Sequence, residues 1–169
     1  MMNAKEIARG GLLAAAAVAL LYIGGAAPYF GPAACIVAGV TSAVPLLRRA
    51  RLRMALLMYA AASILSLLIV PRKSVAAAYV LLTGLYPIVK FGVECYLPRH
   101  VQTGVKLVYF NLVLAVAGAL VAFGLFPQIV LPGFFRLAML WFVANVVFII
   151  YDVALSRLIA LLRRSLPPD

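Results

Sequence analysis

The sequence has few of the side chains on which enzyme chemistry depends. Its 169 residues include four Asp plus Glu, one His and two Cys. Cys35, Cys95 and His100 fall in separate stretches without metal-binding spacing, so we expect no metal site and no bound cofactor. GxSxG, HExxH and glycine-rich phosphate-loop motifs are missing as well. The sequence therefore argues against an enzyme.

Long apolar runs dominate what is present. Hydrophobic residues make up 67% of the chain and charged residues 11%, with a mean hydropathy of +1.14. About 20 apolar residues cross a bilayer core, and continuous runs of that length form helices rather than barrel strands. We predict an all-α membrane protein, a six-transmembrane-helix bundle in one integral membrane domain over residues 1–169. Its helices are expected at roughly 7–27, 31–47, 52–70, 74–97, 104–126 and 133–162.

Basic residues give this bundle an orientation. With the N-terminus in the cytoplasm, the external connections hold only three of the 15 Lys and Arg residues, namely Arg72, Lys73 and Arg136, and Lys90 falls inside the membrane. All the others lie on the cytoplasmic side, in agreement with the positive-inside rule. We therefore expect a multi-pass protein of the cell membrane with both termini cytoplasmic. Anionic lipid beside the cytoplasmic loops accounts for the net charge of +11, so no nucleic-acid partner is expected.

Several polar residues interrupt the last three apolar runs. A charge at membrane depth costs at least about 2.5–3.5 kcal/mol on insertion scales, so such residues are usually paired or functional. Lys90 and Glu94 lie one helical turn apart, and Pro87 before them is expected to kink their helix. We predict an intramembrane polar cluster of Lys90, Glu94, Asn111, Asn145 and Asp152. Two interpretations stay open: pairs that join helices, or an ion path or substrate cavity.

A second set of polar and aromatic residues lies toward the expected external side. These residues are Arg72, Lys73, Tyr79, Thr83, Tyr86, Gln128, Arg136 and Trp141. Together they offer cations, hydrogen-bond donors and aromatic faces that suit a small ligand with an anionic group. The alternative is an aromatic belt with snorkelling cations at the membrane surface.

The first apolar run carries a ladder of small residues. Gly11, Ala15 and Ala19 follow one another at four-residue spacing. Small residues let the backbones of membrane helices approach closely. The ladder therefore predicts either packing within the bundle or a docking face for another membrane protein.

The chain resembles the substrate-binding S components of energy-coupling-factor (ECF) transporters. The stretch ARGGLLAAAAVALLYIGG, Ala8 to Gly25, is similar to the alanine-rich first helix of that family, and Thr41 to Ile69 is similar in style to uncharacterised S-like proteins. The resemblance implies capture of a small molecule from outside and delivery inward by toppling on a coupling subunit driven by two ATPase subunits. Gly11, Ala15 and Ala19 would then dock on the coupling subunit.

Two other functions remain open at this point. One is a structural or assembly protein of the bilayer that binds other membrane proteins through its first helix or its cationic cytoplasmic face. The other is an ion or proton carrier that uses Lys90, Glu94 and Asp152. The sequence identifies no ligand for the binding-subunit hypothesis.

Overall fold

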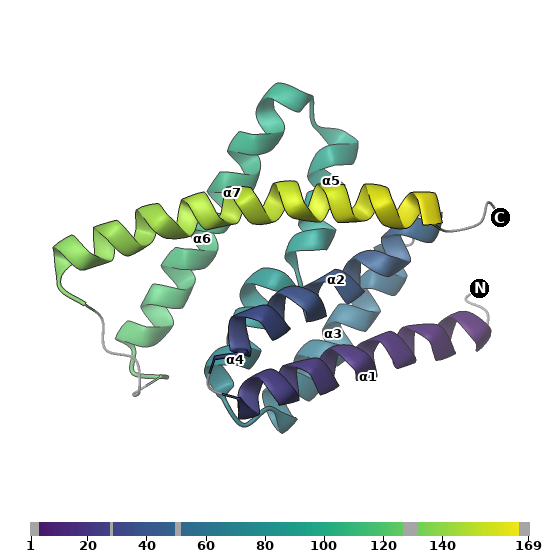
Figure 1. Cartoon of the computed structure of the whole chain (residues 1–169), viewed down its shortest axis with the longest axis horizontal. Helices are drawn as coiled ribbons and strands as arrows, with labels where there is room; N and C mark the ends of the chain where they lie inside the picture. Colours follow the sequence, from purple (N-terminus) through teal and green to yellow (C-terminus); the bar gives the residue numbers. More distant parts are fainter. Residues whose placement is uncertain (1–3, 28, 50–51, 127–131, 166–169) are drawn as a thin grey trace. The chain divides into compact units, whose positions relative to one another are not determined.

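The computed structural model describes residues 4–27, 29–49, 52–126 and 132–165, and within these ranges the regular structure is entirely helical (Figure 1). The elements are α1 (Ala4–Ala26), α2 (Gly31–Arg49), α3 (Leu52–Ile69), α4 (Lys73–Ala78), the π-helical turn η1 (Tyr79–Thr83), α5 (Tyr86–Tyr96), α6 (Arg99–Ala122) and α7 (Phe134–Ser165). The all-helical prediction is confirmed for the described residues.

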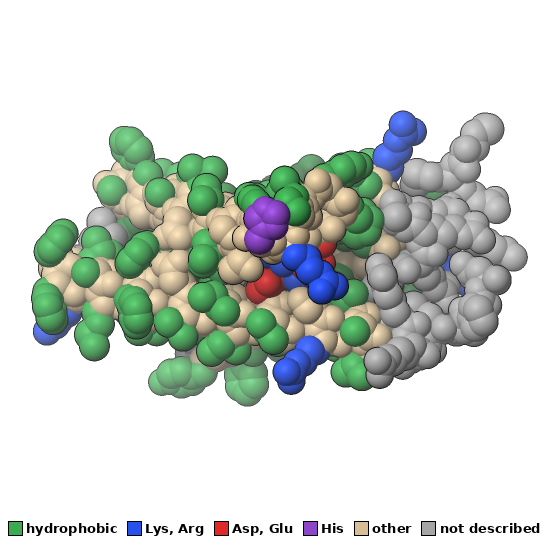
Figure 2. Space-filling view, turned by 90° about the horizontal axis from the view of Figure 1, so that it is seen from above, with side chains coloured by type: hydrophobic (Ala, Val, Ile, Leu, Met, Phe, Trp, Pro, Cys, Tyr) green, Lys and Arg blue, Asp and Glu red, His purple; other side chains and the backbone are tan. Residues whose placement is uncertain are grey.

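Five helical segments are long and apolar enough to cross a membrane. They are Ile7–Ala26, Leu52–Ile69, Lys73–Tyr96, Arg99–Ala122 and Phe134–Leu162. The sixth, Gly31–Leu46, is shorter, so the expectation that every segment has spanning length holds for five of the six. Hydrophobic side chains are spread over the described part of the face shown in Figure 2, and charged ones are few there. The chain is accordingly a multi-pass membrane protein.

The chain divides into two compact units, Met1–Tyr96 and Leu97–Asp169. In the first unit, α1 and α2 lie side by side and pack on α3 and α4 (Figure 1). Two glycines of α1 make this close packing possible: a Cβ at Gly24 would collide with Ala34 of α2, and one at Gly25 would lie 2.7 Å from Val70. The main core cluster of the unit is otherwise made mostly of small and aliphatic side chains and includes Tyr79.

The fourth spanning segment, Lys73–Tyr96, is not a uniform α-helix. At η1 the Gly84 N–H donates to the Tyr79 carbonyl, five residues back, at 2.8 Å. The regular α-helix resumes at Tyr86, and Pro87 is its second residue. The interruption therefore lies one turn before the proline, at a place that the sequence pattern does not indicate.

In the second unit the expected start of α6 at residue 104 is wrong. The helix begins at Arg99, directly after Pro98, whose extended backbone (φ −67°, ψ 148°) occupies the N-cap position. Three of its first four residues are polar, and the Gln102 side chain donates to the Leu97 carbonyl at 2.9 Å. The end of α6 is marked by Gly124, with φ 76°, in a left-handed C-terminal cap.

The last helix is also the longest. α7 has 32 residues, which at about 1.5 Å per residue gives a rod of about 48 Å. A bilayer core is about 30 Å thick. Part of α7 therefore extends beyond the apolar layer even with a moderate tilt.

Candidate functional site

The predicted intramembrane cluster is divided between the two units. Lys90 and Glu94 belong to the first unit, and Asn111, Asn145 and Asp152 belong to the second. Among the described residues, no three His, Cys, Asp or Glu side chains lie together in a way that would hold a metal ion.

In the first unit, Lys90 and Glu94 form the expected ion pair along α5. The Lys90 Nζ and Glu94 Oε1 atoms are 2.6 Å apart. The Lys90 side chain is 1% exposed, whereas that of Glu94 is 39% exposed. The pair thus joins a buried ammonium to a carboxylate that reaches the edge of the unit. It lies within one helix, so the pair itself does not fasten α5 to a neighbour.

In the second unit, an asparagine pair joins α6 to α7. Asn111 Nδ2 donates to Asn145 Oδ1 at 2.9 Å and to the Leu107 carbonyl at 2.9 Å. Trp141 Nε1 donates to Asn111 Oδ1 at 2.6 Å. Asn145 Nδ2 donates to the Trp141 carbonyl at 2.9 Å. These bonds use both polar atoms of Asn111 and both of Asn145, so the pair has the properties of helix-joining contacts.

An ion pair that the sequence reasoning missed lies close to these asparagines. Lys106 Nζ approaches Asp152 Oδ2 at 3.1 Å and Oδ1 at 3.3 Å, and the two side chains are 6% and 19% exposed. The positive-inside pattern counted Lys106 among the cytoplasmic charges, so the predicted polar cluster contained Asp152 but not Lys106. Unlike Lys90 and Glu94, this pair joins two helices, and both of its side chains are largely withdrawn from water, where a charge requires compensation.

The contacts between α6 and α7 follow a single antiparallel register. Lys106 pairs with Asp152, the rings of Phe110 and Phe148 stack with centroids 4.2 Å apart, and Asn111 meets Asn145. Each step forward along α6 corresponds to a step backward along α7. Two antiparallel helices with a regular register form a helical hairpin, and this one is joined by alternating polar and aromatic contacts.

A groove of about 780 Å³ opens between α6 and α7 next to the asparagine pair. Its lining is almost entirely apolar and comprises Asn111, Leu114, Ala115, Gly118, Phe134, Leu137, Ala138, Leu140, Trp141 and Ala144. Asn111 and Trp141 are the polar side chains at its wall, and they are bonded to each other. The groove can accept apolar groups but presents no charge to a ligand.

The residues predicted to bind a ligand near the external side occupy different environments. Tyr79, Thr83 and Tyr86 are buried in the first unit. Lys73 donates from Nζ to the carbonyls of Leu67 and Leu68 at 2.7 and 3.3 Å, so it caps the C-terminal end of α3.

The remaining ligand candidates are placed as follows. Arg72 is half-buried at the N-cap position of α4. Arg136 and Trp141 are exposed on α7 in the second unit, and Gln128 lies outside the described residues. The set is thus divided between buried positions of the first unit, a helix cap and the exposed surface of α7.

No family model, curated protein or solved structure matches this chain.

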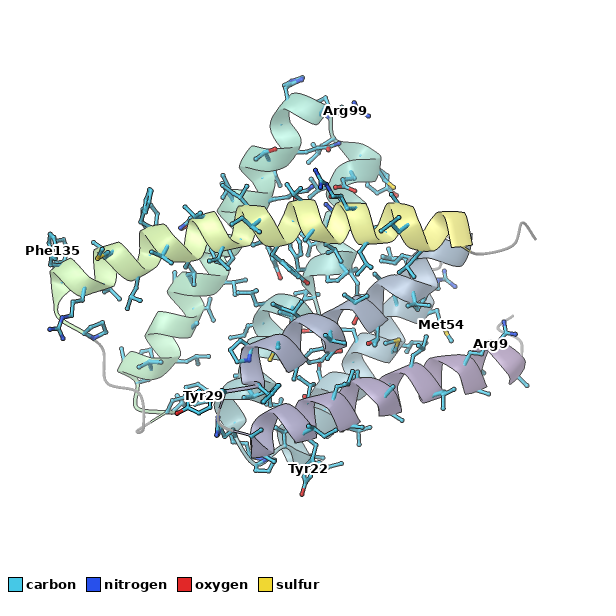
Figure 3. The ribbon with its side chains drawn as sticks, in the orientation of Figure 1. Arg9, Tyr22, Tyr29, Met54, Arg99 and Phe135 are labelled. Atoms are coloured by element: carbon cyan, nitrogen blue, oxygen red, sulfur yellow. The ribbon has the colours of Figure 1, made fainter. Side chains whose placement is uncertain are left out.

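The small-residue ladder of α1 lies on an exposed face of the first unit. Gly11, Ala15 and Ala19 are all exposed, and a Cβ at Gly11 would meet nothing within 4 Å. A shallow groove of about 550 Å³ runs between this face and α3, lined by Ala15, Val18, Ala19, Tyr22, Ile23, Leu65 and Ile69. Tyr22 projects outward from α1 in Figure 3. The ladder is thus open to the surroundings rather than packed inside the unit.

Proposed function

We propose that this chain is a membrane-embedded substrate-binding subunit of an ECF-type transporter, which docks through α1 on a coupling subunit. The observation that carries the proposal is the exposed ladder of Gly11, Ala15 and Ala19 beside a groove. Small side chains permit close helix–helix approach, and an apolar groove receives the larger side chains of the facing helix. The resemblance of the first helix to the docking helix of S components supports the same assignment.

The proposal includes an orientation. Both termini lie in the cytoplasm, with Arg72, Lys73 and Arg136 on the external side, because this arrangement places most basic residues inside. In that orientation the ends of α1 and α2 that meet near Gly24 and Gly31 face outward. A ligand captured from outside would approach the first unit from this end.

Co-purification tests the docking step. The chain is co-expressed with the coupling and ATPase subunits of its own host, and a tag on the chain is used to recover the complex. Ala15→Leu together with Ala19→Leu fills the groove edge, and we expect the coupling subunit to be lost. The matched control is Ala8→Leu together with Ala16→Leu, which adds the same bulk at two exposed alanines of α1 that do not line the groove. Equal recovery with the groove variant and with the control would refute docking through this face.

Native mass spectrometry tests the binding step. The protein is purified gently from its host without added ligand, and its mass is compared with that of Arg72→Ala and Arg136→Ala variants. A co-purified small molecule that is lost from either variant supports a binding subunit. Protein that carries no small molecule, yet retains its membrane partner, contradicts this function.

A structural or assembly role is the second candidate, and the burial of the ligand candidates favours it. Tyr79, Thr83 and Tyr86 are enclosed, and Lys73 caps α3. In an assembly protein the exposed face of α1 would also be a docking face, because it would bind another membrane protein in the same way. The two candidates therefore differ in the ligand and not in the docking face.

A further inference from the structure

The interruption of the fourth spanning segment contains one residue too many for a regular helix. A π-turn closes with a hydrogen bond to the fifth residue back instead of the fourth, and such turns are frequent at functional sites. Here the bond runs from the Gly84 N–H to the Tyr79 carbonyl. A few residues later, Pro87 has no N–H to give to the Thr83 carbonyl. The helix therefore has two adjacent places where its regular bonding is broken.

One side chain from another helix holds the extra residue in place. The Tyr59 hydroxyl, on α3, donates to the Val80 carbonyl at 2.7 Å. In a regular α-helix the Gly84 N–H would be the partner of Val80, but here it is bonded to Tyr79. Tyr59 thus replaces the donor that the π-turn takes away, and it stabilises the turn at this position.

The Thr83 side chain, by contrast, is unfavourable in the π-turn conformation. Thr83 is 5% exposed, and its Oγ1 atom has no hydrogen-bond partner within the described part of the chain. An unpaired buried hydroxyl is unfavourable. In an α-helix a threonine hydroxyl can bond to the carbonyl four residues back, which here is that of Tyr79. The state that satisfies Thr83 is therefore the one in which this turn is α-helical.

We propose that residues 79–87 form a register switch with two states. In the described state the extra residue lies in the turn from Tyr79 to Gly84, and Tyr59 holds the Val80 carbonyl. In the second state this turn is α-helical and the extra residue lies next to Pro87, where one helix bond is already missing. The intervening residues, up to and including Tyr86, rotate by about 100° and shift by about 1.5 Å, while α4 and the part of α5 after Pro87 keep their places.

The switch would change what the middle of this helix presents to α2 and α3. In the described state the Thr83 backbone lies against Gly39 of α2, so closely that a Cβ at Gly39 would collide with the Thr83 carbonyl. Rotation replaces this contact and turns Tyr86 away from its present enclosed position. The inference depends only on the hydrogen bonds of the helix and holds whether or not the chain binds a ligand.

Fluorine NMR of protein labelled with 3-fluorotyrosine tests the switch. The resonance of Tyr86 is assigned by its loss in Tyr86→Phe, and its two components report the two registers. Tyr59→Phe removes the bond to Val80, and we expect the second state to gain about two- to tenfold in population, the effect of one neutral hydrogen bond. Thr83→Val removes the unpaired hydroxyl, and we expect the opposite change.

Opposite changes in the population of the second state for Tyr59→Phe and Thr83→Val distinguish a switch from a general loosening of the core. Tyr79→Phe is the matched control, because it removes a buried hydroxyl in the same turn whose contact, with Ser42, is a long 3.5 Å. We expect no change of population in this control. A single Tyr86 resonance that none of the variants alters would overturn the proposal, as would changes in the same direction for Tyr59→Phe and Thr83→Val. Thr83→Val retains its shape and decides the question if Tyr59→Phe does not fold.

Discussion

Replacing Asp152 by Asn should weaken the α6–α7 hairpin much more than replacing its partner. The Lys106 side chain is 6% exposed, so its ammonium group has little access to water. Removing one member of a buried ion pair typically costs about 3–5 kcal/mol, because the remaining charge stays buried. Insertion scales give about 2.5–3.5 kcal/mol for a lysine at membrane depth. We therefore expect Asp152→Asn to lower the free energy of unfolding by about 3 kcal/mol.

The reverse substitution should cost less. Lys106→Met removes the more buried charge of this pair and leaves a carboxylate that is 19% exposed and partly reachable by water. The expected loss is about 1 kcal/mol, close to the centre of measured point-mutation effects. The double variant should be more stable than Asp152→Asn alone, since two neutral side chains leave no buried charge.

The single tryptophan provides the assay. Trp141 donates to Asn111 across the same hairpin, so its fluorescence reports separation of α6 from α7. Unfolding is followed in mixed micelles by increasing the fraction of denaturing detergent, and the four proteins are compared as a double-mutant cycle. A loss below about 1 kcal/mol for Asp152→Asn, or a double variant no more stable than that single variant, would refute the reasoning.

Two further predictions concern packing and exposure in the first unit. Gly39→Ala should destabilise the protein by about 1–3 kcal/mol, because its Cβ would meet a backbone carbonyl. Gly11→Ala should be neutral, because its Cβ would meet open space. Thermal unfolding of both variants checks this prediction, and equal melting temperatures would contradict it. In detergent, Cys95 should react rapidly with a maleimide and buried Cys35 should not, as mass spectrometry of the labelled protein would show; rapid double labelling of the folded protein would contradict this burial.

Composition and periodicity were sufficient to predict the helical segments, because apolar run length is set directly by the membrane. They were less informative about helix ends. Arg99 and His100 were expected in a loop because they are polar, yet they begin α6, since Pro98 in an extended conformation supplies a helix start. The polarity of a residue indicates whether it lies in the bilayer or in water. The residue at which a helix begins depends instead on caps and prolines.

Side-chain partners were predictable within a helix and less so between helices. Lys90 and Glu94 are four residues apart, and this spacing alone indicates their pair. Lys106 and Asp152 are 46 residues apart, so their pairing depends on the register of two helices. The asparagine pair would have indicated this register. Antiparallel helices that join Asn111 to Asn145 also bring Lys106 level with Asp152.

The π-turn is the feature that no sequence pattern indicated. Pro87 and Gly84 suggest a weak helix, but the π-turn lies where the Tyr59 hydroxyl of α3 donates to the Val80 carbonyl. That contact joins residues 21 apart and exists only after the two helices pack. A tertiary contact of this kind cannot be inferred from the local composition of either helix.

The polar contacts of the α6–α7 hairpin have a consequence for biosynthesis. The ribosome completes α6, with Lys106 and Asn111, well before it reaches Asn145 and Asp152 on α7. Until α7 follows, these two side chains have no α7 partner, and a lysine in an isolated helix resists transfer into lipid. Insertion of α6 before α7 therefore carries the cost of an uncompensated lysine, and pairing with Asp152 removes this cost once α7 has entered the bilayer.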